Sequence, residues 1–210
     1  MTAGACPAAA RARASVLTLA MHDPRGTNPP AAPPEVAMAR RRALARWMNS
    51  PFLKGAAIGY VASKALDSVS IALYDREAQT ERDAENAARG YRHVYEVAVD
   101  QLARLGGRQL DREEQQIWGW RFHQATGIIG GLGYAALRRR NPRVGAAMGL
   151  LFGAGFFLVM DELMMPLLRW SPGPRAFSWK VHARGAAAHI AYGVAAEATA
   201  RALDRAASAI

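Results

Sequence analysis

Val144-Gly-Ala-Ala-Met-Gly-Leu-Leu-Phe-Gly-Ala-Gly-Phe-Phe-Leu-Val-Met160 is a run without a single charged residue. An apolar run of this kind, continued to Leu168, is typical of a membrane-spanning helix. Gly145, Gly149 and Gly153 recur every four residues within it and therefore share one helix face. A neighbouring backbone can approach closely along such a face. The stretch thus predicts a membrane helix that packs through glycine.

Two other segments, 53–74 and 117–137, repeat small residues at the same four-residue spacing, and a weaker fourth segment, 184–203, is mostly alanine. We therefore expect an all-α fold, a bundle of four transmembrane helices joined by an amphipathic periplasmic connector helix. The expected spans are 53–74, 117–137, 144–168 and 184–203. The expected helix-packing residues are Gly55, Gly59, Gly127, Gly131, Gly145, Gly149 and Gly153.

The connector, residues 75–116, holds ten of the seventeen acidic residues. Apolar residues at helical spacing from Ala84 to Leu105 predict one amphipathic helix, which Gly106-Gly107 would end. Asp111 and Glu114 then have the spacing of a capping box, in which each side chain bonds the other residue's backbone N–H. The next helix should begin there.

Residues 1–37 are rich in Ala, Pro and Arg and predict a disordered tail that precedes a membrane domain at 38–210. Translation starting at Met38 instead of Met1 is an open alternative. The apolar residues near Val16 are too few for a signal-peptide core. A single cysteine, Cys6, leaves no intramolecular disulfide.

The net charge of +10 raises the question of nucleic-acid binding. The basic residues instead cluster beside apolar segments, at Arg40–Arg42 and Arg138–Arg140, and no nucleic-acid-binding motif is present. By the positive-inside rule these clusters are cytoplasmic, which places the connector in the periplasm and both termini in the cytoplasm of a bacterial inner-membrane protein. All five tryptophans fall at or near expected span ends, as in an aromatic belt. A mean hydropathy of only −0.08 favours the alternative, a soluble four-helix bundle.

Four motifs follow one another along the chain: Gly55-xxx-Gly59 with Lys64-Ala-Leu-Asp67, Gly130-Gly-Leu-Gly-Tyr134, Asp161-Glu-Leu-Met-Met-Pro166 and Ala188-His189. This order of motifs, over roughly residues 50–203, resembles the YagU-like family of small bacterial inner-membrane proteins. The resemblance implies an inner-membrane location and this helix count, with no established biochemical activity and at best a link to acid tolerance.

Polar residues inside the expected spans fall at a similar depth, in the half of the membrane nearer the periplasm. Charges there are costly, so we expect a periplasm-facing polar cluster, and histidine would supply titration near neutral pH. The alternative is a set of ion pairs that only fixes helix packing, with Arg121 pairing to Asp161 or Glu162. The expected cluster is Lys64, Asp67, Arg121, His123, Asp161, Glu162, His182 and His189.

A second hypothesis is a haem- or metal-binding redox protein that uses His123 and His189 as ligands. No Glu-x-x-His motif lies within a span, and phosphate-loop, dinucleotide and serine-hydrolase motifs are missing from the sequence. The main expectation is therefore a non-enzymatic protein without a cofactor. Its expected partners are the lipid bilayer and, as an open alternative, a second copy of itself.

Overall fold

The computed structural model describes residues 33–141 and 146–209, and the chain divides into two units, 1–42 and 43–210. Helices account for nearly all of the described residues, and no strand is found among them. The α-helices are α2 (Pro34–Asn49), α3 (Pro51–Tyr74), α4 (Gln79–Ala88), α5 (Val94–Leu105), α6 (Arg112–Arg140), α7 (Ala146–Phe157), α8 (Met165–Leu167) and α9 (Trp179–Ser208). A π-helical segment (Leu158–Met164) joins α7 to α8, and a 3-10 turn (Pro174–Ala176) precedes α9. The all-α expectation is confirmed.

Each expected span falls on a long helix, namely α3, α6, the continuous run α7 to α8, and α9. Among the described residues, two stretches are long and apolar enough to cross a membrane, Pro51–Tyr74 and Ala147–Leu167. These two helical stretches are weak evidence that the protein associates with a membrane. Insertion of α6 and α9 stays a prediction.

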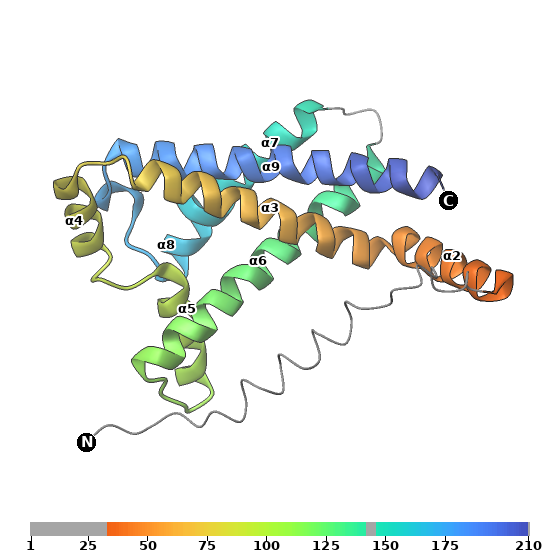
Figure 1. The fold of residues 1–210 in the computed structure, drawn as a ribbon. Helices are drawn as coiled ribbons and strands as arrows, with labels where there is room; N and C mark the ends of the chain where they lie inside the picture. Colours follow the sequence, from red (N-terminus) through yellow and green to blue (C-terminus); the bar gives the residue numbers. More distant parts are fainter. Residues whose placement is uncertain (1–32, 142–145, 210) are drawn as a thin grey trace, which may run out of the picture. The chain divides into compact units, whose positions relative to one another are not determined.

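The backbone contacts between the long helices follow the order α6, α3, α9, α7. In Figure 1, α3 and α9 run side by side, and the most extensive contacts join α3 to α9, α3 to α6, and α7 to α9. By contrast, α6 meets α7 and α9 at only a few backbone positions. Because α6 and α7 lie at opposite ends of this order and touch little, side chains rather than backbone fill the space between them.

Glycines lie where these helices cross. A Cβ on Gly59 would be 2.5 Å from the carbonyl oxygen of Gly127, and one on Gly149 would be 2.5 Å from that of Gly193. Gly55, Gly131 and Gly153 also face a neighbouring helix, whereas Gly145 lies outside the described residues. The face of Gly149 and Gly153 is therefore occupied by α9 of the same chain and is not free for a second copy.

The connector differs from its expected form, because it holds two helices instead of one. Helix α4 ends at Ala88, and Gly90 and Tyr91 follow with φ angles of 62° and 57°. A left-handed turn at two successive residues cannot continue an α-helix. The end of α5 at Gly106 and the Asp111–Glu114 capping box are as expected.

The N-terminal boundary also differs. Most of the expected tail, residues 1–32, lies outside the described residues. However, α2 begins at Pro34, so the last residues of the expected tail, 34–37, are helical.

An aromatic layer occupies the centre of the fold. Tyr134 and Tyr192 are fully buried and pack around Phe152, with Phe156 stacked beside it. The Tyr192 hydroxyl donates to the carbonyl of Gly127 at 2.6 Å. This layer separates two polar regions of the same helices.

Toward the ends of α6 and α9, the polar region is a network of ion pairs. The Tyr134 hydroxyl donates to Glu197, which also accepts from Arg138 at 3.0 Å. Asp204 accepts from Arg138 at 2.6 Å and from Lys54 at 2.8 Å. The network joins the start of α3 to the ends of α6 and α9.

Candidate functional site: a cavity lined by histidines and carboxylates

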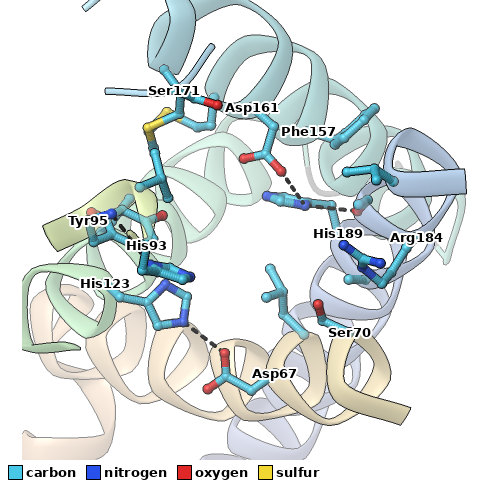
Figure 2. Close-up of a pocket in the computed structure, with 18 of the residues that line it drawn as sticks. Asp67, Ser70, His93, Tyr95, His123, Phe157, Asp161, Ser171, Arg184 and His189 are labelled. Atoms are coloured by element: carbon cyan, nitrogen blue, oxygen red, sulfur yellow. Dashed lines mark hydrogen bonds and ion pairs between the residues drawn. The ribbon is translucent and has the colours of Figure 1, made fainter. Parts of the chain in front are cut away.

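On the other side of the aromatic layer lies a cavity of about 620 Å³. It is lined by α3, α6, the end of α7, the π-helical segment and the start of α9, with residues of α4 and α5 also contributing. Figure 2 shows polar side chains from these elements pointing toward one central space. The cavity is thus assembled from segments far apart in the sequence.

All four histidines of the described residues line this cavity: His93, His123, His182 and His189. Three of them face a carboxylate. His123 Nε2 lies 2.8 Å from Asp67 Oδ1, and His182 Nδ1 lies 2.5 Å from Glu162 Oε1. His189 Nδ1 lies 3.7 Å from Asp161 Oδ2.

The structure therefore brings together six of the eight residues expected in the polar cluster. These are Asp67, His123, Asp161, Glu162, His182 and His189. His93, an exposed residue of the connector, also lines the cavity and is the N-cap of α5.

The pair of Asp67 and His123 depends on the close crossing of α3 and α6. Ser63, four residues before Asp67, packs directly against Gly127, four residues after His123. His123 also packs on the ring of Tyr95, with centroids 4.9 Å apart. Two buried atoms of this pair, Asp67 Oδ2 and His123 Nδ1, have no hydrogen-bond partner among the described residues. A buried polar atom without a hydrogen-bond partner destabilises the folded state. The pair can therefore accept a hydrogen bond from, or donate one to, a water molecule or a ligand, or bind a proton.

The π-helical segment explains how adjacent residues both reach the cavity. In an α-helix successive side chains are turned by about 100° from each other, so Asp161 and Glu162 would diverge. Here the Met165 N–H donates to the Met160 carbonyl, five residues back, which widens the turn. Pro166 has no N–H to bond the carbonyl of Glu162, so an α-helical ladder could not continue through it. Such π-helical interruptions are frequent at functional sites.

Buried ion pairs attach the connector to α9 beside the cavity. Arg184 is only 7% exposed, and it donates to Glu77 at 2.5 Å and to both carboxylate oxygens of Glu85 at 2.6 Å. Glu85 also pairs with Arg89 at 2.6 Å. None of these residues was expected in the site, because the partners are about a hundred positions apart and the connector suggests a solvated surface.

Two expected members lie elsewhere. Lys64 is 3.6 Å from Asp67 Oδ2 and extends over the ring of Trp120, but it is not itself a lining residue. Arg121 is exposed and lies over the Trp118 ring at 4.7 Å. Its expected pairing with Asp161 or Glu162 is wrong: Arg121 is two residues before His123, so it points to roughly the opposite face of α6.

The hydrogen bond that the His182 imidazolium donates to Glu162 raises the pKa of His182 above its usual value, because the carboxylate stabilises the charged ring. His182 also contacts the carbonyl of Pro174 at 3.0 Å. Both contacts favour the protonated ring, so this histidine holds a proton more readily than a free one.

The metal hypothesis can be compared with this geometry. His123 and His189 do line one cavity, but each faces its own carboxylate from a different pair of helices. Within residues 33–141 and 146–209, no three side chains of His, Cys, Asp or Glu converge on a common point suited to a metal ion.

Comparison with known proteins gives no relative to set beside this site. No protein-family model matches the chain, and neither a curated protein nor a solved structure matches it.

Proposed function

We propose that the chain is a non-enzymatic, multi-pass inner-membrane protein whose periplasm-facing cavity responds to protons. The relation to the YagU-like family is part of this proposal. The observation that carries it is the convergence of three histidine–carboxylate pairs on one cavity.

Membrane insertion of all four long helices is supported by their outer surfaces. Each exposes large aliphatic side chains, such as Ile71 on α3, Ile129 on α6, Leu151 on α7 and Val194 on α9. Exposed apolar surface on every long helix is unfavourable in water and suits a lipid environment. Two ionised groups of α9, Arg184 and Glu197, are instead buried and paired.

The ion-pair network supports the proposed orientation. Lys54, Arg138 and Asp204 meet at the end of the helices that carries the arginine cluster 138–140. The acidic connector and the cavity lie beyond the aromatic layer, at the other end. The positive-inside rule then makes the arginine end cytoplasmic and the cavity periplasmic.

Protonation of the histidines provides the response. Histidine changes charge between about pH 5 and 8, so acid converts each neutral imidazole into a cation facing its carboxylate. The groups that face His123 are Asp67 and Lys64 from α3 and Tyr95 from α5. Those facing His189 are Asp161 and the rings of Phe156 and Phe157, and Glu162 faces His182. New positive charge on α6 and α9 would tighten their contacts to α3 and to the π-helical segment.

The test follows the imidazole nitrogens of the purified full-length protein by ¹⁵N NMR between pH 8 and pH 5, in the parent and in Asp67→Asn. The expected result is a pH-dependent change in the imidazole signals of the parent that differs in Asp67→Asn, because this variant removes the carboxylate charge beside His123. Identical pH dependence in the two proteins would contradict the proposal. In cells, a His123→Gln, His182→Gln, His189→Gln triple variant should lose any acid protection that the parent gives, whereas the exposed Glu113→Gln control should retain it.

Haem or metal binding is the alternative function. Absorbance and metal analysis of the same purified protein distinguish it from the proton response. A Soret absorbance band or a stoichiometric metal content would replace the proton-response proposal with a redox or metal-binding function.

A further inference from the structure

The cavity has an excess of negative charge. Its lining contains five carboxylates and two guanidinium groups, and both arginines are already engaged. Arg184 pairs with Glu77 and Glu85, and Arg89 pairs with Glu85. With neutral histidines, the cavity therefore favours a positively charged occupant.

One of these carboxylates is not engaged in a hydrogen bond within the described part of the chain. Glu96 pairs with Arg112 at 3.1 Å, and Asp67 and Glu162 are bound to His123 and His182. Asp161, by contrast, has only His189 Nδ1 at 3.7 Å, and that nitrogen already lies 3.0 Å from the carbonyl oxygen of Gly185.

Asp161 also faces open space. Its side chain is 38% exposed, and Figure 2 shows its carboxylate directed into the cavity. On α9, the residue beside it is Gly185, where a Cβ would lie 3.6 Å from Asp161 Oδ2 and 2.7 Å from the Phe157 ring. The missing side chain lets the Phe157 ring pack against α9 beside the carboxylate.

Aromatic rings surround the same space. Phe156 and Phe157 flank His189, with ring centroids 5.4 and 5.7 Å from the imidazole. Tyr95 and Trp120 line the cavity from the connector and α6. A carboxylate beside aromatic faces is the arrangement that recognises ammonium-type cations. A volume of about 620 Å³ falls in the range of small-molecule sites.

We propose that this cavity binds a bulky organic cation, with Asp161 as its counter-ion and the rings of Phe156 and Phe157 as its apolar wall. This inference rests on the proposed function, because both concern the same cavity. It adds the class of ligand that the cavity binds. A metal ion fits less well, because three ligand side chains do not converge in the described structure. An anion would meet the excess negative charge.

Protons and the cation should compete. Protonation of His189 places a positive charge beside Asp161, which then has an internal partner and attracts the ligand less. The other charged or titratable groups near Asp161 are Glu162 on its own segment, His182 on α9, His123 on α6, and Arg89 and His93 on the connector. Protonation of any of the histidines adds charge of the same sign, so acid should release the cation.

The test uses tetraphenylphosphonium, whose charge does not change with pH, and measures its binding to the purified full-length protein by equilibrium dialysis. The expected result is saturable binding that weakens as the pH falls from 8 to 5. Asp161→Asn should weaken binding roughly tenfold or more, as expected for loss of a charged partner. Glu113→Gln, on the exposed start of α6, is the matched control and should bind like the parent. Equal binding by Asp161→Asn, or equal binding of the anion tetraphenylborate, would overturn the proposal.

A second measurement on the unmodified protein guards against misfolding of the variant. A hydrophobic carbodiimide should modify Asp161, and tetraphenylphosphonium should protect it, as detected by mass spectrometry of the peptide. Modification that is unaffected by the cation, or protection by Zn²⁺ alone, would overturn the assignment. The histidine titration is measured without ligand, so failure of cation binding leaves the proton response to stand or fall separately.

Discussion

Arg184 on α9 and Glu85 on α4 form a two-oxygen ion pair, with Arg184 Nη2 at 2.6 Å from each carboxylate oxygen. Both side chains are almost completely buried, and the guanidinium also lies over the Tyr74 ring at 5.0 Å. This contact attaches the connector to the long helices beside the cavity.

Arg184→Met should therefore destabilise the protein strongly. The substitution leaves Glu77 buried without its partner and Glu85 with Arg89 alone, and breaking a buried pair in this way costs about 3–5 kcal/mol. Thermal unfolding of the purified protein measures the loss. Adding Glu77→Gln and Glu85→Gln to Arg184→Met should recover part of it, because the uncompensated charges are then gone.

The pair of Lys180 and Glu81 is the matched control, since it joins the same two helices but is far less buried, with side chains 43% and 32% exposed. Lys180→Met should leave the unfolding temperature nearly unchanged. Equal losses from Arg184→Met and Lys180→Met would show that burial of the Arg184 pair does not matter.

Gly149 gives a second stability prediction. Its Cβ position is 2.5 Å from the Gly193 carbonyl oxygen, so Gly149→Leu should separate α7 from α9 and lower the stability by several kcal/mol, as for severe overpacking. Gly155 lies on the same helix with no atom within 4 Å of its Cβ position, and Gly155→Leu should be tolerated. Leu150→Ala, at an exposed position, should also have little effect. Thermal unfolding of the three variants in one detergent compares their stabilities directly. Equal unfolding temperatures for Gly149→Leu and Gly155→Leu would show that Gly149 is not at the close contact.

The sequence predicts the positions of the long helices well, and the reason is local. Capping at Asp111, the arginines that end α6 and the glycine spacing of α7 are all determined by neighbours along the chain. The distance of a residue from the end of its helix also follows from its position in the sequence. Asp67, His123 and His189 could therefore be predicted to lie at a similar depth in the membrane.

The sequence does not predict how each helix is rotated about its own axis, nor which residues far apart in the chain become partners. Arg121 shares the depth of His123 but points to another face of α6, so depth alone could not place it. The partnership of Arg184 with Glu85 joins residues 99 positions apart. The π-helical turn at Asp161 has only Pro166 as a local signal, and proline also ends ordinary helices.

The His182–Glu162 pair predicts a pH dependence of stability. The carboxylate raises the pKa of His182 above its usual 6.5, so the native state binds the proton more tightly than the unfolded chain. The stabilisation is complete below the unfolded value, about 6.5, and is lost as the pH rises through the raised native value. The difference in unfolding temperature between the parent and His182→Gln should thus be larger at pH 5.5 than at pH 9. A difference that grows with pH would mean that the pair does not favour the protonated ring.

Topology can be tested independently of stability. If the arginine end is cytoplasmic, alkaline phosphatase fused at residue 95 should be active, because that enzyme folds only in the periplasm. Fusions at residues 45, 140 and 208 should be inactive, and green fluorescent protein at those three positions should fluoresce instead. The paired reporters control for differences in expression, since each site must give one positive signal.

Active phosphatase at residues 45 and 208, with inactive phosphatase at residue 95, would show the opposite membrane orientation and place the cavity on the cytoplasmic side. The cavity histidines would then sense the buffered cytoplasm, and an external-acid response would lose its physical basis. Active phosphatase at both 95 and 140 would show that α6 does not cross the membrane.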